Sequence, residues 1–245
     1  LINSSDIFAV EVCGDPGIGK STVCREVLAR LDSTHYMEVS LVGQVTKISS
    51  LVTILQAAGF KTQGDDIDEK EMEERIYEIT KSKSNHVIYF DNLEDSWNDP
   101  SFRKWFIDFI KMTSWKVLYS SRVHIHIARG IKHYRLPVLS ESAAKAMFLS
   151  LWRDDIPAPV EDQNLPILLE ALSYHPLSIV LVARQSIHYP SVAVLLRKWK
   201  EHEAHDNLSL KDEEGSHRSL RNSIRMSLDA VRINQEALVI WGVMY

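Results

Sequence analysis

GDPGIGKST, at residues 14–22, is the stretch of sequence that decides the fold, because it satisfies the P-loop pattern G-x-x-x-x-G-K-S/T. It follows the β-rich apolar run at residues 7–12 and precedes apolar residues at helical spacing, so the loop is predicted to connect a strand to a helix. Glycines at such a junction let backbone N–H groups turn around phosphate oxygens at the helix N-terminus. A glycine turn that merely contains a lysine is the alternative, and the strand-to-helix context argues against it.

Two side chains of the loop predict how a nucleotide is held. Lys20 is expected to reach the β- and γ-phosphates, and the hydroxyl of Ser21 is expected to contact Mg2+. Many enzymes and switches share this loop, so the class of protein has to come from residues farther along the chain. The other loop residues that we predict to bind nucleotide are Asp15, Pro16, Gly17, Ile18, Gly19 and Thr22.

Apolar runs alternate with helical patterns through the first half of the chain, which predicts a parallel sheet covered by helices on both faces. The expected fold class is α/β, a three-layer α/β/α P-loop NTPase core with a parallel five-stranded sheet. Predicted helices follow the P-loop, cover residues 48–59 and 65–83, and begin again at Asp99 and Pro100. The predicted strands are residues 7–12, 36–42, 86–90, 116–120 and 134–138.

Helical stripes dominate beyond Pro137, with apolar series that begin at Ala144, Leu165 and Leu220. The stretch at residues 201–217 is the most polar of the chain and predicts a mobile linker or a domain boundary. We therefore predict a nucleotide-binding core at residues 1–138, a helical subdomain at 139–205, a linker at 206–218 and a further segment at 219–245.

Two residues downstream of the loop are candidates for the nucleotide site. Asp91 ends the apolar run at residues 86–90, and a carboxylate at the end of a buried parallel strand is placed to hold Mg2+, usually through water. An aspartate that begins a turn is the alternative. Arg122 follows the run at residues 116–120, where a guanidinium could clamp the γ-phosphate or simply lie in solvent. The residues alone leave both interpretations of Arg122 open.

Composition limits the function classes. The net charge of −5 makes nonspecific attraction to nucleic acid weak, and no apolar run is long enough to span a bilayer. Cys13 and Cys24 are predicted to be packing residues of a reduced, cytoplasmic protein, with one disulfide as the alternative. No secretory signal opens the sequence, and its abrupt start and end suggest a fragment of a longer protein.

The histidines do not predict a metal site. His124 and His126 would lie on one face of an extended segment, and His202 and His205 form a second close pair. Neither pair has a third ligand at a recognisable spacing, so we do not expect zinc at either one.

The order of several motifs resembles the NB-ARC domain of the STAND ATPases, a family that includes plant disease-resistance proteins and apoptotic protease-activating factors. The motifs are GDPGIGKST, HVIYFDNLED, KVLYSSR, YRLPVLSESAAKAMF and HPLSIVL. The resemblance implies a five-stranded P-loop core followed by a helical subdomain and a winged-helix subdomain, whose start would be residues 219–245. The family histidine that touches the ADP β-phosphate would fall beyond Tyr245.

The resemblance also implies roles for residues outside the loop. Asp91 would be the Walker B carboxylate, and Arg122 would be the sensor that follows two hydroxyl residues, Ser120 and Ser121. Pro176 would lie against adenine, although a proline that starts a helix is the alternative. These roles add to those of Lys20 and Ser21 on phosphate and magnesium.

One departure from the family makes fast hydrolysis doubtful. The family often has a second acidic residue directly after the magnesium aspartate, but this chain has Asn92 there. An amide cannot accept a proton as a carboxylate does, so Glu94 is the catalytic candidate that remains beside Asp91.

The function that the resemblance implies is a signalling switch of a receptor in immunity or cell death. ADP with Mg2+ would hold the closed form, ATP would permit opening and self-association, and slow hydrolysis would reset the switch. Effector and sensor domains would lie outside this segment. The alternatives are an AAA+ remodelling ATPase, a P-loop small-molecule kinase and an interaction module that has lost its nucleotide.

Overall fold

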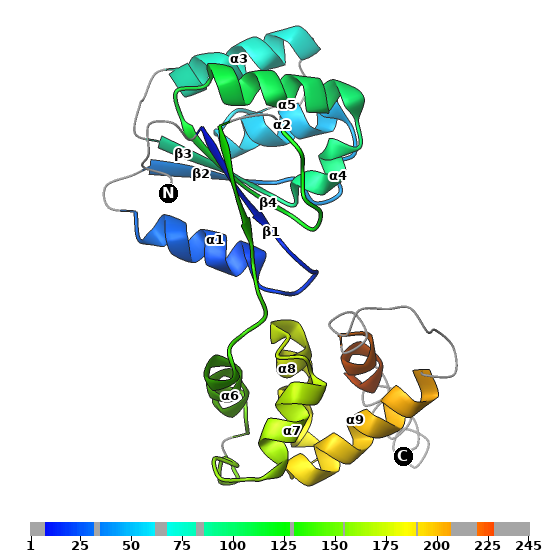
Figure 1. Ribbon diagram of the computed structural model, residues 1–245. Helices are drawn as coiled ribbons and strands as arrows, with labels where there is room; N and C mark the ends of the chain where they lie inside the picture. Colours follow the sequence, from blue (N-terminus) through cyan, green and yellow to red (C-terminus); the bar gives the residue numbers. More distant parts are fainter. Residues whose placement is uncertain are drawn as a thin grey trace, which may run out of the picture. The chain divides into compact units, whose positions relative to one another are not determined.

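A computed structural model describes residues 8–31, 35–61, 68–81, 86–127, 130–153, 155–189, 191–206 and 220–227. The chain divides into two units, Leu1–Leu136 and Pro137–Tyr245, and Figure 1 traces both. Each unit has its own hydrophobic core.

A five-stranded sheet organises the first unit. Its order is β2-β3-β4-β1-β5, and every neighbouring pair is parallel. The fold class predicted from the sequence is therefore confirmed. The strands are β1 (Ala9–Cys13), β2 (His35–Ser40), β3 (His86–Asp91), β4 (Lys116–Ser121) and β5 (Ile131–Arg135).

Helices cover both faces of this sheet, as Figure 1 shows. Alternation along β1 explains why: Val10 and Val12 pack in one cluster with Cys24 and Leu28 of α1, whereas Ala9 belongs to the larger cluster on the other face. That larger cluster includes buried residues of α2, α3 and α5. The helices of this unit are α1 (Lys20–Ala29), α2 (Lys47–Ala57), α3 (Glu69–Lys81), α4 (Leu93–Trp97) and α5 (Pro100–Met112).

Local signals set the start of α5. The Asp99 carboxylate accepts a hydrogen bond from the backbone N–H of Ser101, and Pro100 occupies the first turn, where it needs no donor. The helix then buries Phe106 and Phe109, whose rings pack edge-on against Phe90 of β3. The predicted helix start at Asp99 and Pro100 is confirmed, and these aromatic contacts fix β3, the strand that ends at Asp91.

The fifth strand was predicted in the wrong place. It covers Ile131–Arg135 and not residues 134–138, because β5 is an edge strand whose exposed residues lack the apolar run of a buried strand. Pro137 has no backbone N–H for a sheet, and the last described contact of this region with β1 is the Leu136 N–H to the Cys13 carbonyl, at 2.8 Å. The short helix α4 was not predicted either.

The second unit is helical. Its core contains Phe148, Leu168, Ile179 and Leu195 among its buried residues, and residues 220–227 are also helical. The apolar series in the sequence did not predict α8 or α9. The elements are α6 (Glu141–Ser150), α7 (Asn164–Ala171), α8 (Pro176–Arg184), the 3-10 turn Gln185–Ile187 and α9 (Val192–Asp206).

The predicted linker falls partly on a helix. Residues 201–206 belong to α9, a helix whose apolar residues Leu195 and Trp199 are buried in the core of the second unit. Residues 207–219 and 228–245, which hold the rest of the linker and most of the predicted winged-helix segment, lie outside the described residues. None of the helices in the described ranges combines the length and apolar character that a bilayer crossing requires.

Both cysteines are free and buried, as predicted. Burial raises the pKa of the Cys24 thiol to about 11. At pH 8 the reactive thiolate is then about 0.1% of this thiol, so iodoacetamide should label Cys24 at least about 100-fold more slowly in the folded protein than in urea. Peptide mass spectrometry measures both rates, and equal labelling would show that the thiol is accessible.

Candidate functional site

The loop between β1 and α1 has the backbone of a phosphate cradle. Gly17 and Gly19 adopt φ of 75° and 100°, which side chains other than glycine rarely accept. Gly19 is the N-cap of α1, and within the described residues no side chain caps this helix end. The first-turn N–H groups are therefore left for an anion, and the helix dipole favours one there.

Lys20 is folded over its own loop. Its Nζ donates to the carbonyl oxygens of Gly14, at 2.8 Å, and Asp15, at 3.0 Å. Burial, together with the positive charge of Arg122, lowers the pKa of Lys20, although Glu94 acts in the opposite direction. Carbonyl oxygens carry only a partial negative charge, so phosphate oxygens would be stronger partners for this half-buried ammonium.

Asp91 gathers hydroxyl groups at the carboxyl end of β3. Its Oδ1 accepts from Ser21 Oγ at 2.8 Å, Tyr89 Oη at 2.8 Å and Ser120 Oγ at 2.5 Å. Burial raises the pKa of Asp91, but these bonds and the nearby Arg25 outweigh burial, so the pKa lies below its usual value. An ionised carboxylate beside the Ser21 hydroxyl is a set of hard oxygen donors that fits Mg2+.

Two neighbours of Asp91 were missed in the sequence. Tyr89 donates to the same oxygen, and a guanidinium nitrogen of Arg25 lies 3.7 Å from Asp91 Oδ2 while it pairs with Glu38 at 2.7 Å. The signal for Tyr89 was its position two residues before Asp91 on a strand, which puts both side chains on one face. Arg25 gave no such signal, because its link to Asp91 crosses from α1 to β3.

Arg122 and Glu94 meet in an ion pair. Arg122 Nε lies 3.1 Å from Glu94 Oε1, with the Glu94 side chain 12% exposed and the Arg122 side chain 54% exposed. Arg122, the predicted phosphate sensor, thus contacts Glu94, the catalytic candidate, although the two come from different segments of the chain. The ion pair places a positive charge beside this carboxylate, and neither of its oxygens has a hydrogen-bond partner among the described residues.

Asn92 follows Asp91 in the left-handed region, with φ of 64° and ψ of 52°, a conformation that asparagine tolerates better than most residues. Its backbone N–H donates to Ser120 Oγ at 3.0 Å. Its side-chain Nδ2 is buried and has no hydrogen-bond partner among the described residues. This amide is a spare donor at the position where the family often has an acid.

The loop residues, Asp91, Asn92 and Arg122 line one pocket of about 350 Å³, whereas Glu94, the catalytic candidate, does not line it. Of the nucleotide-binding residues predicted in the first unit, Asp15 and Ile18 do not line it. Ile18 is buried, and its N–H donates to the Asp15 carbonyl at 3.2 Å. Val42 lines the pocket without having been predicted. The lining residues are Pro16, Gly17, Gly19, Lys20, Ser21, Thr22, Val42, Asp91, Asn92, Ser120 and Arg122.

Pro176 belongs to the second unit. It is buried at the first turn of α8, where His175 is the N-cap and its Nδ1 accepts from the Ser178 N–H at 3.4 Å. The helix-starting interpretation of this proline is thus confirmed. Its contact with adenine stays a prediction.

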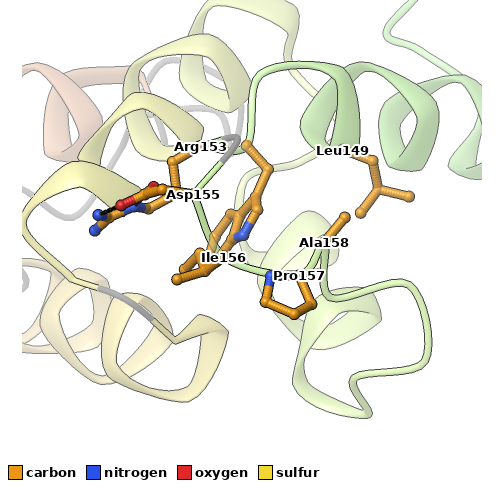
Figure 2. Close-up of a pocket in the computed structure, with 7 residues that line it drawn as sticks. Leu149, Arg153, Asp155, Ile156, Pro157 and Ala158 are labelled. Carbon is orange, nitrogen blue, oxygen red and sulfur yellow. Dashed lines mark hydrogen bonds and ion pairs between the residues drawn. The ribbon is translucent and has the colours of Figure 1, made fainter.

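A larger hollow in the second unit, of about 500 Å³, offers less to a nucleotide. Figure 2 shows Leu149, Ile156, Pro157 and Ala158 around it, with Arg153 pointing to Asp155. The Arg153 guanidinium is used by the Asp155 carboxylate and by two backbone carbonyls. A cation already paired in this way is a poor phosphate ligand, so the smaller P-loop pocket is the candidate nucleotide site.

Comparisons with known proteins agree with the geometry. The family model of an AAA domain matches residues 9–117. A curated disease resistance protein of Arabidopsis thaliana is 24% identical over 141 residues, which are 55% of this chain and 15% of that protein. The chain therefore spans about 15% of the length of this relative.

Solved structures resemble the chain at low identity. A Walker-type ATPase of Pyrococcus abyssi has a TM-score of 0.55 at 10% identity, covering 94% of this chain and 72% of its own. The Orc1 protein of Aeropyrum pernix, solved in complex with DNA, has a TM-score of 0.58 at 11% identity, covering 82% and 63%. Such identities show the fold alone. Fold and loop together define the first unit as a P-loop NTPase domain.

Proposed function

We propose that this protein is an ADP/ATP-binding switch of an NB-ARC-like receptor, in which the presence of the γ-phosphate is read by Arg122. The motif order and the similarity to a disease resistance protein support this class. In the proposal Lys20 and the loop N–H groups hold the phosphates, Ser21 and Asp91 hold Mg2+, and Pro176 covers adenine. ATP then favours opening and self-association through domains outside this segment.

The ion pair between Arg122 and Glu94 is the observation that carries the proposal. A ligand shifts a two-state equilibrium only by binding the two states differently. Arg122 Nε lies 3.1 Å from Glu94 Oε1. ADP brings no γ-phosphate to compete, so in the proposal Arg122 keeps this partner when ADP is bound. With ATP, the γ-phosphate competes for the same guanidinium, because phosphate offers it more charge and more acceptors than one carboxylate. The switch is then the exchange of one anion for another.

Slow hydrolysis follows from the same geometry. Asn92 can donate its free Nδ2 to a phosphate oxygen or orient a water molecule, but it cannot accept a proton from that water. In the proposal Glu94 serves as the ionic partner of Arg122 and not as the base. We therefore expect the protein to bind nucleotide but to hydrolyse ATP slowly.

The decisive experiment compares ATP and ADP affinity in two opposite variants. Arg122→Ala should weaken ATP about 10- to 100-fold, because it removes a charge-assisted contact of roughly 1.5–3 kcal/mol, with a much smaller effect on ADP. Glu94→Gln should strengthen ATP binding, since it frees Arg122 from its ionic partner. Isothermal titration calorimetry with both nucleotides and Mg2+ measures each affinity.

Arg30→Ala is the matched control, because this exposed arginine follows α1 as its C-cap and pairs with Glu26 of that helix. It should leave both affinities unchanged. An unchanged ratio of ATP to ADP affinity in Arg122→Ala would refute γ-phosphate sensing by this residue. A fall in ATP affinity in Glu94→Gln would refute competition between Glu94 and phosphate.

An AAA+ remodelling ATPase is the second candidate, favoured by the AAA-domain match and the Orc1 likeness. It would turn over ATP rapidly with an arginine supplied by a neighbouring copy, so its rate would rise steeply with protein concentration. The switch should instead release bound ADP on denaturation and hydrolyse ATP slowly. The Orc1 structure was solved in complex with DNA, but the net charge of −5 disfavours DNA binding by this chain.

A further inference from the structure

Three side chains outside the nucleotide pocket converge at the β5 edge of the sheet. Glu11 lies on β1, which runs between β4 and β5, and His133 of β5 is its direct cross-strand partner. Neighbouring residues in register point to the same face of a parallel sheet. His124 reaches the same point from the segment that follows β4.

Both histidines aim the same ring atom at one oxygen. Nδ1 of His124 and Nδ1 of His133 each lie 2.6 Å from Glu11 Oε2. One donor atom from each of the three residues falls within 4.8 Å of the others, close enough to surround a single ion. The two imidazole rings meet edge to face, with centroids 4.3 Å apart.

The second oxygen of Glu11 is held by the backbone. The N–H of Ile125 donates to Oε1 at 2.7 Å, which fixes the carboxylate and leaves Oε2 to the two histidines. A hydrogen bond to the far oxygen of a ligating carboxylate is the usual way in which proteins orient such a ligand.

The charge of Glu11 needs a positive partner. Its side chain is fully buried, and across the described ranges no lysine or arginine pairs with it. A buried carboxylate is costly unless a charge compensates it, and neutral imidazoles contribute hydrogen bonds without charge. A divalent cation between Oε2 and the two Nδ1 atoms would supply that charge.

We propose that Glu11, His124 and His133 bind a divalent transition-metal ion, with Zn2+ as the first candidate. Two imidazoles and one carboxylate are a common zinc ligand set, completed by water. Imidazole nitrogen selects transition metals over Mg2+ and Ca2+. The histidine side chains are 39% and 36% exposed, so an ion can enter and water can fill the remaining position.

The ion would tie three parts of the first unit together: β1, the edge strand β5 and the segment after β4. Arg122 lies two residues before His124 in that segment, but His124 and His133 do not line the P-loop pocket. The site is therefore separate from the nucleotide site and does not depend on the proposed switch.

The test is a zinc titration of chelator-treated, nucleotide-free protein in millimolar Mg2+. One Zn2+ should bind per chain and raise the Tm by about 5–10 °C at 100 times the Kd, from the mass-action stabilisation of the folded state. Either His124→Ala or His133→Ala should weaken binding at least about 10-fold. Co2+ should give visible absorption bands of a low-coordinate site, a readout that requires no variant.

Two controls separate this site from other sources of zinc binding. His35→Ala removes an exposed histidine on β2, at the opposite edge of the sheet, and should bind zinc like the parent. Asp91→Asn damages the proposed magnesium site and should also bind zinc normally. If zinc leaves the Tm unchanged, or if the double variant of His124 and His133 still binds one zinc, the inference is wrong.

Discussion

Replacing Lys20 by alanine is expected to abolish retention of ADP and ATP. The ammonium now donates to two carbonyl oxygens of its own loop, at 2.8 and 3.0 Å, so its donors already point into the cradle. Phosphate would replace these contacts by charge-assisted ones, each about 1.5–3 kcal/mol. The loss of two such contacts lowers nucleotide affinity by about 100-fold or more.

The measurement is chromatography of the nucleotide released from purified, denatured protein, followed by titration calorimetry with ADP. Lys104→Ala removes an exposed lysine of α5 and serves as the control for the change in net charge. Circular dichroism should be the same for all three proteins, because the hydrogen bonds of the Lys20 ammonium stay within its own loop. A Lys20→Ala protein that still purifies with ADP would mean that the phosphates lie elsewhere.

The sequence predicted those parts of the fold that depend on neighbours along the chain. The P-loop, the buried strand that ends at Asp91 and the helix that starts at Asp99 all follow from local patterns. A buried strand is apolar on both faces, so its run of residues is visible in the sequence. The edge strand β5 has no such run, and its position is set by pairing with β1, which only the folded sheet displays.

Site residues that come from distant segments were harder to predict. The link of Arg25 to Asp91 depends on the packing of α1 against the sheet. The proposed metal ligands illustrate the same point. The sequence paired His124 with His126, whose ring it does contact, but only the folded sheet also brings it to His133 and Glu11. Glu11 lies in a strand that reads as apolar, and a buried glutamate has no sequence pattern of its own.

For Ser120 the geometry supplies a physical reason that the family resemblance lacked. The family pattern placed hydroxyl residues before Arg122 but gave no reason for them. In the structure Ser120 donates to Asp91 and accepts the N–H of Asn92, so it connects β4, the strand that precedes Arg122, to β3, the strand that ends at Asp91. A small hydroxyl serves here because it both donates and accepts at short range.

Asp91→Asn is expected to remove the dependence of nucleotide binding on Mg2+. The substitution preserves shape, and its amide oxygen can still accept hydroxyl groups, so the fold should persist. The charge that attracts the ion is lost. Mg2+ should tighten ATP binding to the parent protein by about 10-fold or more and leave the variant unchanged, while any hydrolysis falls about 100-fold or more.

The pH dependence of the Mg2+ effect distinguishes the charge of the Asp91 carboxylate from that of other titrating groups. The folded-state pKa of Asp91 is lowered below 3.8, so the carboxylate is ionised at neutral pH and its contributions to stability and Mg2+ binding are lost only as pH falls through that lowered value. Between pH 8 and 5 the Mg2+ effect on the parent should therefore show no decline from this residue. Asp108→Asn, at a half-exposed position on α5, is the charge-matched control. If Mg2+ tightened ATP equally in Asp91→Asn, the ion would have to be held by phosphate and Ser21 alone, and the hydroxyl cluster around Asp91 would serve only to join the strands.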